Sequence, residues 1–382
     1  FKLINEIFGI EKGNEILLKQ ADIIKKHAVD GYLYGRVGED HFVVIADEAT
    51  FNEEYLYECR ETLQNVLSDS VYNVRVCFGI YRTDNMNESL SFMCDKASFA
   101  VASIKDDTHS FIAYYDDTML EAAIKYKTIV DEFDDAIKAG EFKMYLQPQI
   151  SAKTRRLTGA EALVRRIKPD GTIISPIDFI PVYEKSGLIS RLDRYIWEQA
   201  AAKLGEWKKA GINMSISVNI SPKDFYYIDI FNTFAGLIKK YDIEPSNLKI
   251  EITETTIMSD VPNLMGELEE LRKAGFTLEM DDFGSGYSSL NTLKDINVDV
   301  LKVDMGFIKE TKNVKKSRII LASVIKMAKE LNLLIITEGV ETEEQVDNLT
   351  KLGCDVFQGY YFSKAIDVNE FEKRYLYRKK AG

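Results

Sequence analysis

From Phe142 to the C-terminus, short apolar runs alternate with stretches of helical periodicity, and this alternation restricts the fold more than any other feature. Helical stretches such as Leu192–Ala210 and Ser317–Leu331 separate most of the runs. Eight strand-and-helix units in roughly 240 residues predict a (β/α)8 barrel. A doubly wound open sheet is the alternative that the pattern leaves open. The candidate strands are Phe142–Leu146, Leu157–Val164, Ser215–Ile220, Leu248–Thr253, Phe276–Asp281, Val298–Asp304, Leu333–Glu338 and Cys354–Gly359.

The first 116 residues have the pattern of a small α/β unit instead. A helical stretch precedes two candidate strands, Tyr32–Val37 and Phe42–Ala46, which a polar turn separates. Thr118-Met-Leu-Glu121 has the form of a capping box, and Gly140 is placed to end the helix that follows it. A chain of 382 residues also exceeds what one hydrophobic core usually supports. We therefore expect an α/β domain at 1–117, a connector helix at 118–140 and the barrel domain at 141–382.

Composition excludes several classes of protein. No apolar run approaches the roughly 20 residues of a membrane span, so we expect no membrane contact by this part of the protein. The 61 acidic residues exceed the 49 basic ones, and the net charge of −12 argues against binding to bulk nucleic acid. The four cysteines lack disulfide or zinc spacing, which favours a reducing cytoplasm. Because the chain opens on Phe1 rather than Met, we expect it to be a fragment of a longer protein.

Acidic side chains stand at or near the ends of the candidate barrel strands. All three histidines precede residue 110, so a barrel enzyme would have to use carboxylates, amides or lysine. In a barrel the strand ends converge on one face, where crowded carboxylates are tolerable only if cations neutralise them. Oxygen ligands without Cys or His favour Mg²⁺ or Mn²⁺, and adjacent Asp281 and Asp282 can serve two neighbouring ions. The candidate residues are Glu161, Asn219, Glu251, Asp281, Asp282, Asp304 and Glu338, with Lys302 in the same layer.

Each of these residues also has an ordinary structural explanation when it is taken alone. A glutamate at a strand end is usually solvated or a helix-capping partner, and Asp-Asp before Phe-Gly is more often a turn. Glu161 is harder to explain in this way, because an unpaired carboxylate inside an apolar strand is costly. Another enzymatic alternative is a Mg²⁺-dependent lyase or isomerase with Lys302 as the base. That reaction would need fewer carboxylates and a more basic pocket, so we disfavour it.

Ordered motifs run through residues 142–371 and carry a family resemblance. They are Gly159-Ala-Glu-Ala-Leu-Val-Arg165, Phe179-Ile-Pro, Gly187-Leu-Ile, Val218-Asn-Ile-Ser221, Glu251-Ile-Thr-Glu254, Asp281-Asp-Phe-Gly-Ser-Gly-Tyr-Ser-Ser289, Lys302-Val-Asp304, Glu338-Gly-Val-Glu341 and Gln358-Gly359. Glu161-Ala162-Leu163 is the triplet for which the EAL domain is named, and this region resembles that family of cyclic di-GMP phosphodiesterases. The resemblance implies a modified barrel whose first strand runs antiparallel.

The resemblance also implies an activity, hydrolysis of cyclic di-GMP to linear pGpG with two Mg²⁺ or Mn²⁺ ions per site, and Ca²⁺ is expected to inhibit. The family's metal ligands match Glu161, Asn219, Glu251, Asp281, Asp282 and Glu338, with Asp304 close to the second ion or the attacking water. Lys302 matches the lysine that contacts this water. Substrate-contacting positions match Gln147, Leu163, Arg165, Asp193 and Gln358, with Asp193 toward a guanine edge. Glu254 matches the anchor of the loop Gly284–Ser289, which links the site to a homodimer interface.

The departures from the family pattern are few in the barrel and more serious in the first domain. Ser285 replaces a common Thr, and Ala365 stands where Pro is frequent, but every metal ligand is kept. Residues 1–117 resemble a GGDEF cyclase domain that lacks its first strand, and the signature reads Gly38-Glu-Asp-His-Phe42. Glu39 puts bulk and charge where glycine lets a triphosphate approach, and His41 removes a carboxylate of the cyclase metal site. We therefore expect no diguanylate cyclase activity, and a structural or regulatory role for this domain.

Two interpretations of the whole chain follow from the resemblance. The first is an active phosphodiesterase in the cytoplasm, which can be the cytoplasmic part of a larger, membrane-tethered signalling protein. The second is a catalytically silent cyclic di-GMP receptor that signals through a protein partner. Silent receptors normally go with lost motif residues, and none is lost here.

Overall fold

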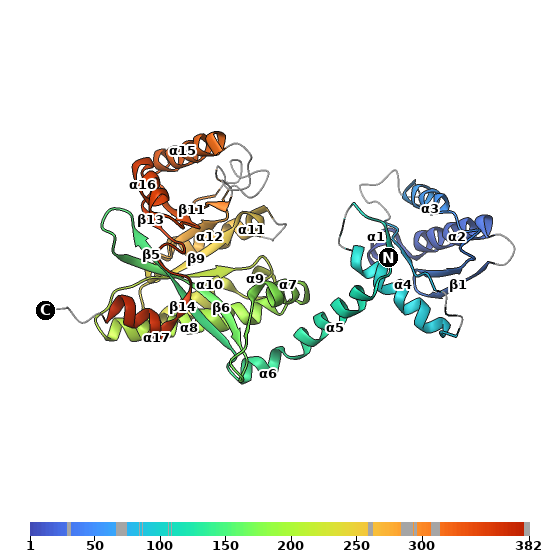
Figure 1. The fold of residues 1–382 in the computed structure, drawn as a ribbon, viewed down its shortest axis with the longest axis horizontal. Helices are drawn as coiled ribbons and strands as arrows, with labels where there is room; N and C mark the ends of the chain where they lie inside the picture. Colours follow the sequence, from blue (N-terminus) through green and yellow to red (C-terminus); the bar gives the residue numbers. More distant parts are fainter. Residues whose placement is uncertain are drawn as a thin grey trace. The chain divides into compact units, whose positions relative to one another are not determined.

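A computed structural model of the chain describes residues 1–28, 32–65, 75–83, 85, 87–105, 107, 109–258, 263–283, 293, 296–306 and 314–377 (Figure 1). The chain divides into two compact units, Phe1–Thr128 and Ile129–Gly382. Among the described residues, no helix combines the length and the apolar character that crossing a bilayer would require.

The first unit is a small α/β domain with two pairs of strands. The antiparallel hairpin of β1 and β2 turns at Glu39, whose φ is 41°, and β3 pairs with β4 in parallel. Ile16 and Ile23 of α2 pack against Cys59 and Leu63 of α3 to form its main core. The predicted hairpin is therefore present. The elements are α1 Lys2–Phe8, α2 Ile10–His27, β1 Leu33–Gly38, β2 His41–Ile45, α3 Glu54–Gln64, β3 Phe78–Ile80, α4 Leu90–Ile104 and β4 Ile112–Tyr114.

The connector consists of two helices, α5 (Asp117–Asp131) and α6 (Phe133–Lys138), rather than the single helix that the sequence predicts. The interruption falls at Glu132, whose carboxylate lies 2.7 Å from the Arg166 guanidinium of the barrel. The predicted capping box at Thr118 is also wrong, because Asp116 caps the helix by accepting the Thr118 N–H at 2.9 Å. Gly140 ends the segment with a φ of 64°, as its position predicts.

The second unit is a closed barrel of eight strands, which confirms the predicted fold and excludes the open sheet. Strands β6 and β8 to β13 pair in parallel in that order. Strand β5 closes the ring by pairing antiparallel with both β6 and β13, as the resemblance implies. The barrel strands are β5 Phe142–Ser151, β6 Leu157–Ile167, β8 Ile216–Ile220, β9 Leu248–Thr253, β10 Leu278–Asp281, β11 Val300–Asp304, β12 Leu334–Glu338 and β13 Val356–Phe357. Short strands β7 (Ile173–Ile174) and β14 (Ile366–Asp367) extend the sheet at β6 and β5.

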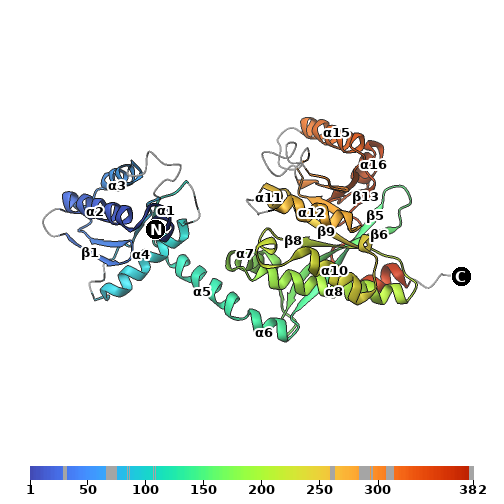
Figure 2. The ribbon, with the colours of Figure 1, turned by 180° about the vertical axis from the view of Figure 1, so that it is seen from behind.

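Helices cover the outside of the barrel (Figure 2). The longest, α8, buries Ile196, Ala200 and Leu204 against the strands, because residues four apart lie on one face of a helix. Glycines in the left-handed conformation end α7 and α16, and Thr342 with Gln345 forms a capping box at the start of α16. The helices are α7 Pro176–Ser186, α8 Ile189–Lys209, α9 Asp224–Tyr227, α10 Ile230–Tyr241, α11 Glu254–Met258, α12 Leu264–Lys273, α15 Val314–Glu330, α16 Glu343–Leu352 and α17 Val368–Phe371, with the short helices η2 Pro245–Asn247 and η3 Glu372–Leu376.

Candidate active site

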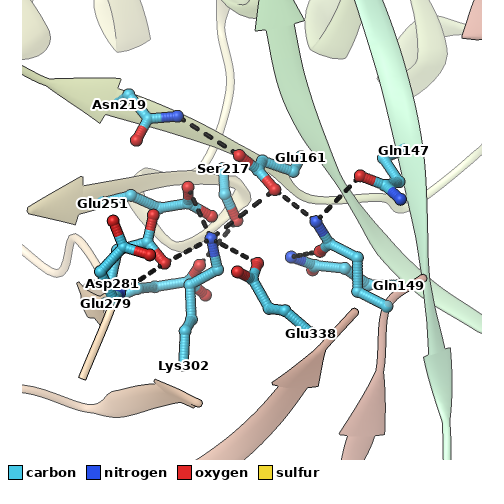
Figure 3. A network of polar contacts seen from close by, with 12 residues as sticks. Gln147, Gln149, Glu161, Ser217, Asn219, Glu251, Glu279, Asp281, Lys302 and Glu338 are labelled. Carbon is cyan, nitrogen blue, oxygen red and sulfur yellow. Dashed lines mark hydrogen bonds and ion pairs between the residues drawn. The ribbon is translucent and has the colours of Figure 1, made fainter. Parts of the chain in front are cut away.

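Strand register brings the acidic side chains together at the carboxyl end of the barrel (Figure 3). Asn219 on β8 is paired with Glu251 on β9, and Asp304 on β11 is paired with Glu338 on β12. Because successive residues of a strand point to opposite faces, Glu251 and Asp281 point into the barrel while Ile250 and Met280 pack outward in the apolar core. The convergence of these side chains therefore follows from the alternation in each strand and from the parallel pairing of the strands.

The ammonium group of Lys302 lies at the centre of this cluster and is fully buried. Its Nζ is 2.9 Å from Glu251 Oε2 and 2.9 Å from Glu338 Oε1. Asp281 Oδ1 lies at 3.2 Å and Glu161 Oε2 at 3.6 Å. Four carboxylates thus face one positive charge, and the cluster carries an excess of negative charge when all four are ionised.

Burial and mutual repulsion raise the proton affinity of these groups. Burial raises the pKa of Glu251 well above its ordinary value, and the nearby Glu161 carboxylate adds to the shift. Burial also raises the pKa of Glu338 to about 8, although the Lys302 charge opposes this. For Lys302 itself burial lowers the pKa, but Glu161, Glu251, Glu338 and Asp281 outweigh it, so its pKa is raised. The lysine is therefore charged at neutral pH, whereas part of the carboxylate set holds protons.

We expect the free energy of unfolding of the metal-free protein to fall as the pH rises from about 4.5 to about 8. Folded Glu338 keeps its proton up to about pH 8, whereas the unfolded side chain loses it near 4.5. Between these values the folded state binds more protons, so raising the pH favours unfolding, by at most about 1.4 kcal/mol per pH unit for this proton. Urea denaturation in a chelating buffer at a series of pH values measures the slope. Glu338→Gln should flatten it, and parallel slopes for the variant and the wild type would contradict the assignment.

A chain of amides continues the site toward β5. Gln358, which follows β13 and is buried, donates its Nε2–H to Glu161 Oε2 and also lies 3.4 Å from Gln147 Oε1. Gln149 Nε2 donates to Gln358 Oε1 at 3.2 Å, and Asn219 Nδ2 donates to Glu161 Oε1 at 3.4 Å. Glu161 therefore receives hydrogen bonds on both of its oxygens, and its orientation is fixed from two sides.

The remaining acidic residues of the site are placed by their backbones. Asp282 has a left-handed φ of 55°, and its N–H donates to Asp281 Oδ1 at 2.9 Å. Burial raises the pKa of Asp282, and Asp281 adds to this. Asp304 Oδ1 accepts the Gly306 N–H at 2.7 Å. A Cβ at Gly339 would lie 3.1 Å from the same oxygen, and its φ of 67° also favours glycine there.

The other predicted residues have different settings in the structure. Leu163 and Arg165 follow Glu161 at alternate positions of β6, so they share its face, and the Arg165 guanidinium lies 5.9 Å from the Tyr145 ring centroid. Asp193 on α8 makes no contact with the cluster among the described residues. Burial raises the pKa of Asp193, and the nearby Asp224 carboxylate raises it further. Glu254 is buried at the start of α11. The loop that Glu254 is predicted to anchor, 284–289, lies outside the described residues, so that link stays a prediction.

Sequence reasoning missed four polar residues inside the barrel. Gln149, Ser217, Lys249 and Glu279 each stand two positions from a candidate site residue on the same strand. Glu279 and Ser217 are fully buried. The signal that could have found them is the same alternation, since residues two apart point to the same face.

The donor set suits a hard divalent cation by its chemistry. All of its ligand atoms are carboxylate or amide oxygens, the ligand type that such a cation prefers. As the side chains stand, no group of three or more His, Cys, Asp or Glu among the described residues is arranged to hold a metal ion, because the carboxylates converge on Lys302 instead. The residues therefore fit a hard divalent cation in type and charge.

Comparison with known proteins identifies the same two domain families as the sequence motifs do. The EAL domain model matches residues 130–365, and the model of the diguanylate cyclase GGDEF domain matches residues 1–110. The chain is 31% identical to the signaling protein YkoW of Bacillus subtilis over 98% of its own length and 47% of YkoW. It is 28% identical to the bifunctional diguanylate cyclase/cyclic di-GMP phosphodiesterase MucR of Pseudomonas aeruginosa, over 97% of this chain and 55% of MucR. The chain thus spans about half the length of these curated relatives.

A solved structure named PaMucR phosphodiesterase, c-di-GMP complex, resembles the barrel unit. It is 32% identical, covers 64% of this chain and 99% of its own, and superposes with a TM-score of 0.60. The family match extends over more than half of the sequence and coincides with the barrel that carries the carboxylate cluster. The chain belongs to the EAL domain family, with a GGDEF domain preceding its EAL domain.

Proposed function

We propose that this chain hydrolyses one phosphodiester bond of cyclic di-GMP to give linear pGpG. The observation that carries the proposal is the convergence of Glu161, Glu251, Asp281 and Glu338 on Lys302 at the carboxyl end of the barrel. A relative with 32% identity in this region has been solved as a phosphodiesterase in complex with cyclic di-GMP. The family motifs are retained at every one of these positions.

The proposed reaction assigns a task to each part of the site. Two Mg²⁺ or Mn²⁺ ions held by Glu161, Asn219, Glu251, Asp281, Asp282 and Glu338 would supply charge neutralisation and a more acidic attacking water. Lys302 orients that water and offsets the charge that develops on the phosphate, with Asp304 beside it. Arg165 offers two parallel N–H groups to a phosphate. Gln147, Leu163, Asp193 and Gln358 position the nucleotide.

For the first domain we propose a structural or regulatory role without cyclase activity. The turn between β1 and β2 carries Glu39 and Asp40, and His41 begins β2, where the cyclase signature has glycine and a second carboxylate. The Asp40 carboxylate lies 3.3 Å from the His41 imidazole, so one of the remaining acidic groups already has a neighbouring partner. A triphosphate would meet a negative side chain at Glu39.

The protein is expected to convert cyclic di-GMP to pGpG in Mg²⁺ or Mn²⁺, as followed by chromatography of the nucleotides. In Ca²⁺ alone we expect binding with little cleavage, because calcium accepts a looser and larger coordination shell. The same chromatogram with GTP as substrate is expected to show no cyclic di-GMP. Binding of cyclic di-GMP without turnover in any of these metals would instead indicate the silent receptor. Brisk hydrolysis in Ca²⁺ would contradict the proposed metal chemistry.

A further inference from the structure

A second layer of side chains lies inside the barrel, one step below the carboxylate cluster. Ser217, Lys249 and Glu279 precede Asn219, Glu251 and Asp281 by two residues, so they point inward from the same three strands. We call these three residues the polar floor. On the other side of the barrel the corresponding space is filled by Val300, Ile336 and Val356, which is the usual content of a barrel interior.

The polar floor is organised around the Glu279 carboxylate, which is fully buried. Glu279 Oε1 lies 2.9 Å from Lys249 Nζ, and Oε2 accepts a hydrogen bond from Ser217 Oγ at 2.8 Å. Both oxygens of Glu279 therefore have a donor. A buried ion pair is seldom a gain over apolar packing, so a charged pair in this position calls for a reason other than stability.

Strand register places Glu251 within reach of the same lysine. Lys249 and Glu251 share a face of β9, about 7 Å apart along the strand. Glu279 on the neighbouring strand β10 is paired directly with Glu251. The flexible side chain of Lys249 is therefore long enough to form an ion pair with either Glu279 or Glu251. It pairs with Glu279, and Glu251 is left with Lys302 as its ion-pair partner among the described residues.

We propose that Glu279 is a positioning residue that holds the Lys249 ammonium in the floor and so keeps this cation away from Glu251. Glu251 then remains available to a divalent ion. To bind this ion, Glu251 has to give up only its ion pair with Lys302. The inference rests on the proposed phosphodiesterase function, because it concerns the metal affinity of that site. Its specific content is that Glu279 is needed only while Lys249 is present.

Titration calorimetry with Mn²⁺ alone, without nucleotide, tests this proposal on four proteins: the wild type, Glu279→Gln, Glu279→Asp, and the double variant Lys249→Met with Glu279→Gln. Glu279→Gln frees Lys249 to pair with Glu251 and is expected to weaken Mn²⁺ binding about 10- to 100-fold, the range for loss of an outer partner of a metal ligand. The double variant removes the competing cation, and Glu279→Asp keeps the pair with Lys249. Both are expected to bind Mn²⁺ within about threefold of the wild type, well below that range.

In turnover assays the effect of Glu279→Gln should appear in the metal requirement, with kcat recovering at saturating Mn²⁺. Wild-type affinity in Glu279→Gln would overturn the proposal, since it would mean that Lys249 turns to solvent instead. A double variant as weak as Glu279→Gln would also overturn it. Should Glu279→Gln fail to fold by circular dichroism, the double variant and Glu279→Asp decide alone, and more than tenfold weakening in either counts against the proposal. Absence of Mn²⁺ binding by the folded wild type would contradict the proposed function itself, and this inference with it.

Discussion

Glu251→Gln is expected to lower the rate of cyclic di-GMP hydrolysis by well over 100-fold. Loss of an outer partner of a metal ligand costs about 10- to 100-fold in affinity or activity, and Glu251 is proposed to be a ligand itself. The amide keeps the size of the side chain but replaces a charged oxygen donor with a neutral one. Because burial already favours the neutral form of Glu251, the metal-free variant should remain folded. The rate at saturating Mn²⁺, together with a Mn²⁺ titration, measures the loss.

Glu330→Gln is a matched control for this substitution. Glu330 ends α15 and is exposed, and among the described residues its one ion pair is a long one of 3.9 Å with Lys326, so its loss should leave the rate and the metal affinity unchanged. A folded Glu251→Gln protein with the wild-type rate would remove Glu251 from the metal set. The convergence on Lys302 would then have to be explained as a structural ion-pair cluster.

Lys302→Met is expected to lower kcat about 10²- to 10⁴-fold, the contribution of a group that positions or transfers a proton in the chemical step. Binding of cyclic di-GMP in Ca²⁺ should change much less than kcat, because the proposed role of Lys302 lies in orienting water rather than in holding nucleotide. The substitution also leaves four carboxylates without their central positive charge. Breaking a buried ion cluster in this way typically costs about 3–5 kcal/mol.

The stability of Lys302→Met separates the two roles of the lysine. Without metal, its free energy of unfolding should be lower than that of the wild type, and Mn²⁺ should stabilise the variant more than the wild type, since a divalent ion supplies the missing charge. Single-turnover rates, calorimetric binding in Ca²⁺ and urea denaturation with and without Mn²⁺ measure these three quantities. An equal loss of nucleotide affinity and kcat would place Lys302 in substrate binding instead. The exposed Lys326→Met is the control for loss of a lysine charge.

The barrel could be predicted from sequence because its signals are local. Each strand is a short apolar run, and the helices between them have their own periodicity, so all eight candidate strands are found in the structure with shifts of a few residues at their ends. The convergence of Glu251, Asp281 and Glu338 could also be predicted, because these residues stand at the ends of parallel strands, which all end on one face of the barrel. The short strands β7 and β14 have no such pattern. Their hydrogen-bonding partners are β6 for β7 and β5 for β14.

Features that depend on contacts between distant residues could not be predicted. Glu132, where the connector is interrupted, pairs with Arg166 on β6, and helical periodicity carries no trace of that pair. The pairing of Lys249 with Glu279 likewise depends on register between β9 and β10. Lys302 was predicted to lie in the carboxylate layer, but its position at the centre of four carboxylates follows only from the assembled barrel.

The antiparallel strand β5 has a consequence for how this domain is made. Its hairpin partner β6 follows it directly, whereas its other neighbour, β13, pairs Val356 with Ser151 and is separated from it by nearly the whole domain. During synthesis the β5–β6 hairpin can form early, but the other edge of β5 keeps unpaired backbone groups until β13 and then β14 have left the ribosome. A nascent or truncated chain that lacks β13 therefore presents an open sheet edge to other chains, and the ring closes only once β13 has been made.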